Sequence, residues 1–236
     1  MTKNKMSDKF IGKWVFPSDD SLLEQSARRG ERYNFENIAN DIIDKVHFEP
    51  EDIVMDLCCG NAALAKYVSK TCKEIHGVDH SEHLIRTANK IKEKESISNL
   101  HLYLSDAMNI DKLFREDFFD KSYCYFSFQY FNKRKRELLL AQLSRVTKRK
   151  GWIFLGDIPD KTRIWNFYES PKKFYREKIS RILQFKEGEC NLGWWIDPKE
   201  IVQWCDSHRL NVSIMPQDKN MPHAHYRFDV LIRNSK

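Results

Sequence analysis

The chain has 236 residues, a length that fits one large domain or one domain with an insertion. Its 41% hydrophobic residues suffice for a core, and its 8 glycines exclude collagen-like and linker-rich chains. No run approaches the roughly 18 apolar residues of a membrane span, and the first residues lack the apolar stretch of a signal peptide. Six cysteines without a CxxC pair predict reduced thiols, so we expect a cytoplasmic protein with no membrane partner.

The net charge of +6 is concentrated in one segment. Residues 133–150 carry a local charge of +7, because eight basic residues are accompanied by a single acid, Glu137. The rest of the chain is close to neutral. A basic helix face is usually a solvated surface, and nucleic-acid binding is the alternative interpretation of this segment. The charge therefore disfavours nucleic acid as a partner without excluding it.

Apolar periodicity predicts alternating helices and strands along the chain. The spacing over Phe35–Val46 is that of an amphipathic helix, within an N-terminal helical segment of about residues 18–50. A short apolar strand is predicted at residues 53–57, followed by Gly60 and a helix near Leu64. The next predicted elements are a strand at 75–78, a helix capped by Ser81, a strand at 100–104, a strand at 123–126, a helix over 138–146 and a strand at 151–155.

This alternation predicts the fold class. Short apolar strands between amphipathic helices indicate an α/β fold, here a seven-stranded, mostly parallel, Rossmann-like sheet with helices on both faces. A helix start at Asp197-Pro198 and strands at 210–215 and 226–232 predict a reversed final β-hairpin. We expect residues 1–236 to form a single domain. An aromatic and basic insertion at about 160–192 is either a helical lid over the substrate or a helix pair packed on the core.

Acidic residues end or follow the first three predicted strands. Asp56 ends the first, Asp79 follows the second, and Asp106 follows the third. Ligands of open parallel sheets bind beyond the carboxyl ends of the strands, so we expect these acids at one edge. Asp79 can accept two hydrogen bonds from a ribose diol, and Asp106 can accept one from an adenine amino group. The turn at residues 58–60 has small residues that allow a ligand to approach the backbone.

Five segments resemble, in order and spacing, those of the class I S-adenosylmethionine-dependent methyltransferases. They are Val54–Gly60, Gly77–Asp79, Ser105–Ala107, Phe119-Asp120 and Arg145–Gly151. The resemblance implies S-adenosylmethionine as cofactor and S-adenosylhomocysteine as its product. It departs from the family in the first loop, where Cys58 replaces the first glycine and Ala62 the third. The loss of glycine makes a positive φ costlier at Cys58.

The resemblance also implies which residues contact the cofactor. Asp56 would orient the loop, in which Cys58 stands in the place of a glycine, and Gly60 would face the methionine portion. Asp79 would bind the ribose hydroxyls, with His80 and Leu84 nearby. Asp106 and Ala107 would contact the adenine, and Tyr125 would lie beside the methionine portion or the sulfonium. Cys58 and Cys59 are interpreted as small core residues rather than nucleophiles.

Methyl transfer chiefly requires that the acceptor be held in line with the sulfonium carbon, and a hydroxyl acceptor also benefits from a general base. The base candidates are Asp157 after the fifth strand, and His223 and His225 before the last one. Tyr130 could orient an acceptor. The two histidines fit a surface loop equally well. Two histidines without a third ligand do not make a metal site, so no metal is predicted.

The expected acceptor is a small polar molecule, a sugar or another hydroxyl- or amine-bearing metabolite. An aromatic-rich insertion suits a sugar ring, and residues 151–160 and 225–229 are similar to methyltransferases of surface-polysaccharide and natural-product gene clusters. The alternatives are an RNA methyltransferase, a non-catalytic cofactor-binding scaffold, and a dehydrogenase, whose G-x-G-x-x-G loop is missing here. The identity of the acceptor, the methylated atom and the oligomeric state stay open.

Overall fold

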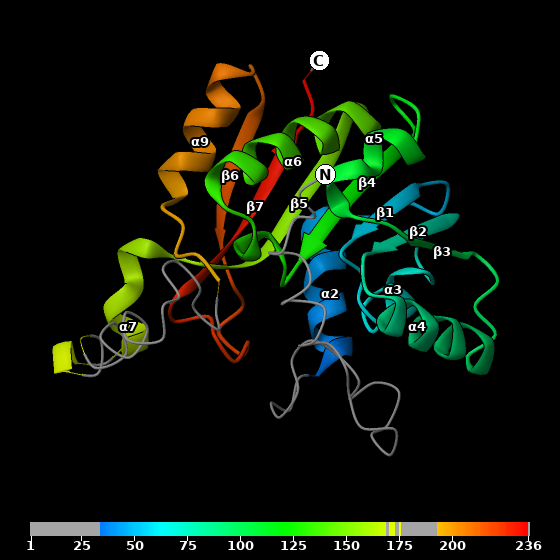
Figure 1. The fold of residues 1–236 in the computed structure, drawn as a ribbon, viewed down its shortest axis with the longest axis horizontal. Coiled ribbons are helices and arrows are strands. Elements are labelled where there is room, and N and C mark those ends of the chain that lie inside the picture. The colour runs from blue at the N-terminus through cyan, green and yellow to red at the C-terminus, as the bar shows by residue number, and fades with distance from the viewer. Residues whose placement is uncertain (1–33, 169, 173–174, 176–192, 236) are drawn as a thin grey trace, which may run out of the picture.

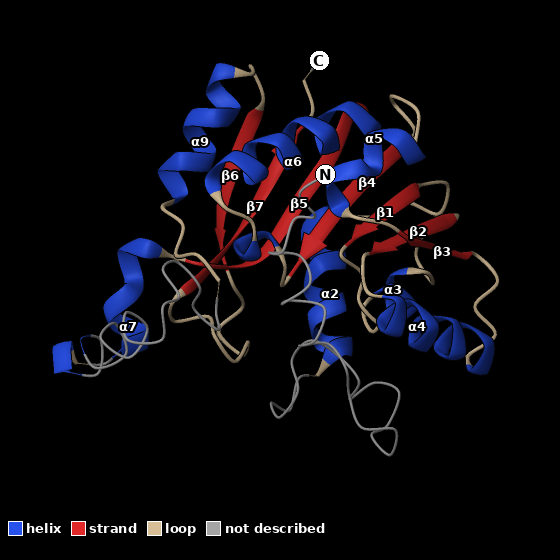
Figure 2. Cartoon of the chain, in the orientation of Figure 1, coloured by secondary structure: helices blue, strands red, loops and turns tan. Residues whose placement is uncertain are grey.

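A computed structural model describes residues 34–168, 170–172, 175 and 193–235. It contains seven strands: β1 (Ile53–Leu57), β2 (Glu74–Asp79), β3 (Leu100–Leu104), β4 (Phe119–Tyr125), β5 (Thr147–Pro159), β6 (Asn211–Pro216) and β7 (Arg227–Arg233). They form one sheet of order β3-β2-β1-β4-β5-β7-β6 (Figures 1 and 2). All neighbours from β3 to β5 are parallel, whereas β7 is antiparallel to both β5 and β6. The predicted fold class, including the reversed final hairpin, is confirmed.

Helices cover both faces of the sheet (Figure 2). The described helices are α2 (Phe35–Val46), α3 (Ala65–Val68), α4 (Glu82–Lys94), α5 (Ile110–Leu113), α6 (Lys133–Val146), α7 (Ile164–Tyr168) and α9 (Pro198–Ser207), with short 3₁₀ turns η2 (Ala107–Asn109), η3 (Phe128–Tyr130) and η4 (Lys161–Arg163). One apolar core lies between the sheet and α2, α3 and α4, and the other between the sheet and α5, α6 and α9. Among the described helices none is both long and apolar enough to cross a membrane.

Local chemistry explains where the helices begin. The side chain of Asn34 accepts a hydrogen bond from the backbone of Asn37 at 3.0 Å and starts α2, whose buried stripe includes Ile38 and Ile42. Ser81 caps α4 in the same way, as predicted, and Asp197 caps α9 with Pro198 in its first turn. These caps fix the point at which the chain turns from each strand or loop into a helix.

Two strands are longer than predicted. The sequence placed a strand at 123–126 and another at 151–155, whereas β4 begins at Phe119 and β5 extends over Thr147–Pro159. Gly151 permits the extension, because a side chain there would lie 2.4 Å from the carbonyl oxygen of Asp120 on β4. The polar residues around this glycine had concealed the first part of β5.

Two predicted segments fall partly outside the described residues. The N-terminal helical segment of about 18–50 is described from residue 34 onwards, where α2 confirms its second half. The insertion of about 160–192 is described at its start, as η4 and α7, and at residues 170–172 and 175. Its interpretation as a lid therefore stays a prediction.

Candidate functional site

The loop between β1 and α3 has an unusual backbone. Cys58, Gly60 and Ala62 have φ angles of 62°, 56° and 61°, so every second residue from 58 to 62 has a left-handed backbone conformation. Only glycine adopts this conformation readily, and the other two residues are held there against a cost of about 1–2 kcal/mol each. A side chain at Gly60 would meet no atom within 4 Å, so open space borders the loop at this residue. The loop exposes its backbone to a ligand at the carboxyl end of β1.

Asp79 ties this loop to the end of β2. Its carboxylate accepts a hydrogen bond from the backbone N–H of Gly60 at 2.9 Å and another from that of Ser81 at 2.8 Å. The residue is 6% exposed, and burial raises the pKa of Asp79, although these backbone bonds and the neighbouring His80 act to lower it. His80 itself is exposed, with Nδ1 3.6 Å from Asp79. A carboxylate offers about four acceptor positions, so Asp79 keeps capacity to accept from a ligand.

Asp56 is a second buried acid beside Asp79. Within the described residues, its Oδ2 atom is buried and has no hydrogen-bond partner. Burial raises the pKa of Asp56 to about 7; the adjacent Tyr123 hydroxyl lowers it, and the charge of Asp79 raises it further. The loop is thus flanked by two carboxylates that repel each other, a site that favours a ligand with hydrogen-bond donors or positive charge.

The remaining residues predicted for cofactor binding follow the ends of β2, β3 and β4. Asp106 is exposed and caps η2 by accepting a hydrogen bond from the backbone of Met108 at 2.9 Å. Ala107 and Leu84 are buried at the starts of η2 and α4. Tyr125 ends β4 and packs over Gly156 of β5, where any side chain would lie 2.1 Å from the tyrosine ring. Together with the β1 loop, these residues line the carboxyl ends of four neighbouring strands.

Asp157, predicted as a base, lies in a buried ion pair. It is 3% exposed, and its carboxylate contacts the guanidinium of Arg227, which is fully buried. Its backbone N–H donates to Asp229 at 2.8 Å, and its φ is 63°. The pair keeps the Asp157 carboxylate engaged by a buried guanidinium.

A chain of polar contacts extends from this ion pair to α2. The Nε2 atom of Gln217 lies 3.3 Å from the Tyr125 hydroxyl, from Oδ1 of Asp157 and from Oδ1 of Asp229. Asp229 in turn accepts from Lys45 of α2 at 2.7 Å. Burial raises the pKa of Asp229 to about 6, against the lowering effect of Lys45. The carboxyl ends of β4 and β5 are therefore held to α2 and β7 by side chains far apart in sequence.

Sequence reasoning missed four members of this network: Lys45, Gln217, Arg227 and Asp229. One signal was available. Arg227 and Asp229 alternate with apolar residues at the start of β7, so both charges point to the same face of the sheet. Charges placed in this way at an interior strand need partners, since unpaired buried charges are rarely tolerated.

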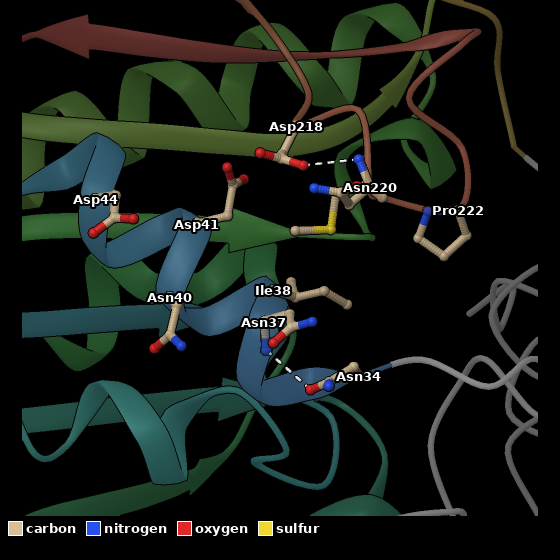
Figure 3. A pocket seen from close by; sticks show the side chains of 10 residues that line it. Asn34, Asn37, Ile38, Asn40, Asp41, Asp44, Asp218, Asn220 and Pro222 are labelled. Atoms are coloured by element: carbon tan, nitrogen blue, oxygen red, sulfur yellow. Dashed lines mark hydrogen bonds between the residues drawn. The ribbon is translucent and has the colours of Figure 1, made fainter.

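A cavity of about 290 Å³ lies next to this network, between α2 and the loop that joins β6 to β7 (Figure 3). Its lining combines the carboxylates of Asp41, Asp44 and Asp218 and several asparagine amides with the apolar side chains of Ile38, Met221 and Pro222. Asp41 contacts Lys45 at 2.6 Å, and burial raises the pKa of Asp41. Asp218 directly follows Gln217, so the cavity is joined through one residue to the Tyr125 hydroxyl.

The other predicted catalytic residues lie around the same loop or on η3. His223 and His225 stand in the β6–β7 loop, where their rings lie 5.3 Å and 4.8 Å from the ring of Tyr226. His225 is exposed, and its carbonyl oxygen accepts from Asn166 at 2.7 Å. Tyr130 is half-buried at the end of η3, beyond β4. His223, His225 and Tyr130 stay separate candidates.

Comparisons with known proteins find similar sequences and folds. Residues 54–151 match a family model described as "Methyltransferase domain". A probable cobalt-precorrin-6B C(15)-methyltransferase (decarboxylating) of Methanococcus vannielii is 33% identical over 73 residues, which are 31% of this chain and 41% of that protein. The protein of the same name from Methanococcus maripaludis strain C7 is 34% identical over 68 residues, 29% of this chain and 38% of that protein. The chain thus spans about two fifths of the length of these relatives.

Solved structures share the fold over most of the chain. A geranyl diphosphate C-methyltransferase from Streptomyces coelicolor A3(2), in complex with Mg²⁺, geranyl diphosphate and S-adenosyl-L-homocysteine, has a TM-score of 0.63 at 12% identity, covering 95% of this chain and 87% of that one. A SAM-dependent methyltransferase from Methanosarcina mazei has a TM-score of 0.62 at 15% identity, covering 81% and 94%. At such low identity these likenesses concern the fold.

Proposed function

We propose that this chain is a class I S-adenosylmethionine-dependent methyltransferase and transfers a methyl group from S-adenosylmethionine to a small polar acceptor. The observation that carries the proposal is the β1 loop, with its left-handed backbone at alternate residues and the buried carboxylates of Asp56 and Asp79 beside it. Bound there, the cofactor supplies an electrophilic methyl group on its sulfonium. The residues of the chain bind it and position the acceptor.

The loop and its acids fit the polar groups of this cofactor. The open space at Gly60 admits the methionine portion against the backbone. Asp79 has acceptor capacity left for the ribose diol, and the exposed Asp106 can accept from the adenine amino group. Asp56 lies close enough to Asp79 to feel its charge, and its Oδ2 atom has no hydrogen-bond partner among the described residues, so a positively charged ligand would stabilise it as a carboxylate. Cys58, His80, Leu84, Ala107 and Tyr125 complete the proposed contacts.

The acid-lined cavity supports a polar acceptor. Carboxylates and amide groups bind hydroxyl or amine donors, and Ile38, Met221 and Pro222 can contact an apolar ring face, so the cavity of Figure 3 suits a sugar or an amine-bearing metabolite. Through Gln217, the cavity adjoins Tyr125 at the end of β4. We assign acceptor binding to this side of the site.

The predicted catalytic residues divide into two roles. His225, exposed beside the cavity loop, and His223 are the candidates for a general base, and Tyr130 for orienting the acceptor. Asp157 is better suited to positioning, because its carboxylate is paired with Arg227 and contacts Gln217, which reaches Tyr125. Its substitution is expected to act through Tyr125 rather than through loss of a base.

RNA is a less suitable acceptor than a small molecule. Part of the basic segment is occupied by protein groups: Arg136 contacts Glu200 at 3.0 Å, Lys148 contacts Asp120 at 2.8 Å, and Arg145 donates to two carbonyl oxygens of α5 and its end. Residues 148–150 lie at the amino end of β5, opposite the proposed site.

The five described cysteines are free, which supports a reducing, cytoplasmic location.

Calorimetric titration tests the cofactor proposal. We expect S-adenosylmethionine and S-adenosylhomocysteine to bind one per chain, and NAD not to bind. Failure of both sulfur ligands to bind, or preferential binding of NAD, would refute it. Labelled methyl transfer to nucleotide sugars, small amines and total RNA then identifies the acceptor class. Incorporation into RNA would overturn the small-molecule assignment, and binding without transfer to any acceptor would favour the non-catalytic scaffold.

A further inference from the structure

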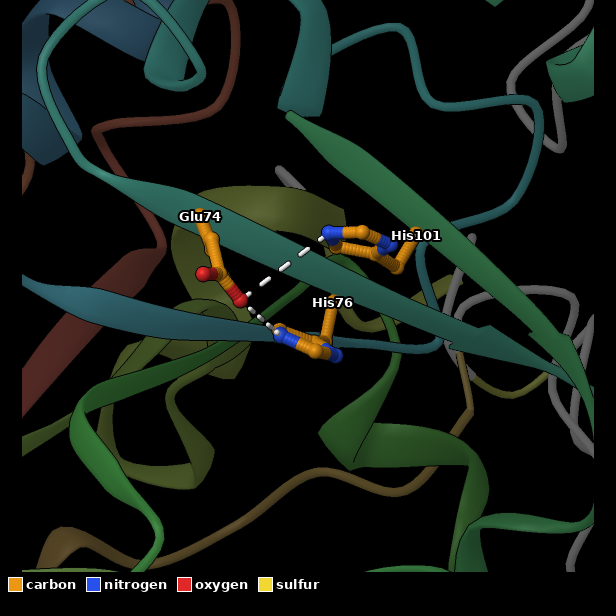
Figure 4. A group of neighbouring side chains, drawn as sticks. All are labelled: Glu74, His76 and His101. Carbon is orange, nitrogen blue, oxygen red and sulfur yellow. Dashed lines mark hydrogen bonds and ion pairs between the residues drawn. The ribbon is translucent and has the colours of Figure 1, made fainter. Parts of the chain in front are cut away.

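Three potential metal ligands meet on one face of the sheet, away from the site described above. His76 of β2 pairs directly with His101 of β3, and Glu74 precedes His76 by two residues, so all three side chains point to the same side (Figure 4). Oε2 of Glu74 lies 3.4 Å from Nε2 of His76 and 3.9 Å from Nε2 of His101. All three ligand atoms lie within 4.8 Å of one another.

A contact behind the cluster orients its most buried ligand. Nδ1 of His76 lies 3.1 Å from the Tyr103 hydroxyl, and this ring nitrogen points away from Glu74. Ligating histidines usually hold a hydrogen-bond partner on the other ring nitrogen, which fixes the ring and its tautomer. Aromatic rings, including those of Phe114 and Phe119, surround the imidazole at 5.8 Å and 5.5 Å. The Nε2 atom of His76 is thereby directed toward Glu74 and His101.

The surroundings of the cluster also suit a cation. The side chains of Glu74 and His101 are 36% and 43% exposed, which leaves an open side for entry and for water. The carboxylate supplies the negative charge that balances a divalent ion.

We propose that Glu74, His76 and His101 bind a divalent transition-metal ion of the Zn²⁺ class, with water in the fourth position. Zinc holds nitrogen and oxygen ligands at about 2.0–2.2 Å, which places tetrahedral ligands roughly 3.3–3.6 Å apart. The distances from Glu74 to the two imidazoles, 3.4 and 3.9 Å, are close to that spacing. Small side-chain rotations of the half-exposed Glu74 and His101 complete the site.

The proposed metal site is structural rather than catalytic. Glu74 begins β2 and Asp79 ends it, and at about 3.3 Å per residue the two are separated by roughly 16 Å. The metal would join β2 to β3, the strand at the open edge of the sheet. An ion that binds only the folded chain stabilises it by RT ln(1 + c/Kd), where c is the concentration of free ion. The metal would thus hold together β2, which ends in Asp79, and β3, which Asp106 follows.

The test uses the full chain, freed of metal with a chelator and titrated with zinc chloride. We expect one zinc ion per chain at this site, and a rise in unfolding temperature of about 5–10 °C at a zinc concentration about 100 times Kd. Glu74→Gln and His101→Gln are each expected to weaken zinc binding at least tenfold. Tyr103→Phe, which removes only the contact behind His76, is expected to weaken it about tenfold.

His208→Gln is the matched control, because His208 is an exposed histidine on the far side of the molecule at the end of α9. It is expected to bind zinc like the natural chain. Unfolding temperatures measured in chelator alone verify that each variant is folded. Absence of zinc binding to the natural chain would overturn the proposal. So would unchanged binding in Glu74→Gln and His101→Gln, which would place the ion on cysteines or on His223 and His225.

Discussion

The two halves of the carboxyl edge are built from contacts of different range. At β1–β3, the acids bind backbone groups at most 19 residues away: Asp79 accepts from Ser81 and from Gly60, and Asp106 accepts from Met108. At β4–β7, contacts join distant parts of the chain. Asp157 pairs with Arg227, 70 residues away, and Lys45 pairs with Asp229, 184 residues away.

This difference matches the two tasks proposed for the site. A cofactor that is the same throughout a family can be bound by short motifs, each made of the end of a strand, its acid and the loop that follows. An acceptor that differs between members is suited to side chains brought together by the rest of the fold. The β1–β3 half is therefore expected to respond to substitution mainly in cofactor affinity, and the β4–β7 half mainly in stability.

The largest effect is expected from breaking the buried ion pair. Arg227→Met leaves the buried Asp157 carboxylate without its counter-charge and should lower the free energy of unfolding by about 3–5 kcal/mol. The double variant Asp157→Asn with Arg227→Met should recover part of this loss. Arg86→Met is the control, because Arg86 forms an exposed ion pair with Glu82 at 3.7 Å; its effect should stay within about 0.5 kcal/mol. Urea unfolding measures all of these, and equal losses at Arg227 and Arg86 would contradict the proposed division.

The next effect concerns pH. The pKa of Asp56 is about 7 in the folded chain, against roughly 3.9 when unfolded. The folded state therefore keeps the proton of Asp56 to a higher pH than the unfolded state does. The stability that this protonated side chain contributes is lost as pH rises from about 4 through 7. Asp56→Asn removes the titration, so its stability relative to the natural chain should increase over that range, by at most about 4 kcal/mol. Parallel curves of unfolding free energy against pH would show that Asp56 does not titrate there.

Asp79→Asn should separate binding from stability. The variant keeps one acceptor oxygen for the backbone but loses the charge, so the affinity for S-adenosylhomocysteine should fall by about 1.5–3 kcal/mol, roughly 10–150-fold. Calorimetric titration measures this loss. Glu93→Gln, an exposed acid on α4, is the control and should bind the ligand normally. An unchanged affinity in Asp79→Asn would remove this residue from the cofactor site.

The same contrast explains what could be predicted from the sequence. Strands β1 to β3 and their acids were recognisable, because a strand, its terminal acid and the following cap are neighbours in the chain. Ser81 and Asp197 likewise predicted helix starts, because a capping residue lies next to the helix that it caps. The fold class followed from the regular alternation of these local patterns.

The β4–β7 half could not be predicted in this way. Nothing near Lys45 indicates Asp229 as its partner, and Gln217 reaches Tyr125 only because the β6–β7 loop returns to the carboxyl edge. Asp157 was identified by its position after the fifth strand, but its buried ion pair depends on Arg227 in the last strand. The cluster of Glu74, His76 and His101 also needed the β2–β3 register, because His101 follows His76 by 25 residues.

The smallest expected effect tests the altered glycine loop. Cys58 has a φ of 62°, where an L-residue is strained by about 1–2 kcal/mol, so Cys58→Gly should relieve that strain. Glycine also gives the unfolded chain about 0.4–1 kcal/mol more entropy, so the net gain in unfolding free energy should be about 0.5–1 kcal/mol. The adjacent Cys59 is the matched control: it is buried and has no positive φ, and Cys59→Gly should destabilise the chain instead. Urea unfolding of the two variants compares them directly. Losses of similar size at both positions would mean that the loop is not strained at Cys58, and that cysteine is accepted there without cost.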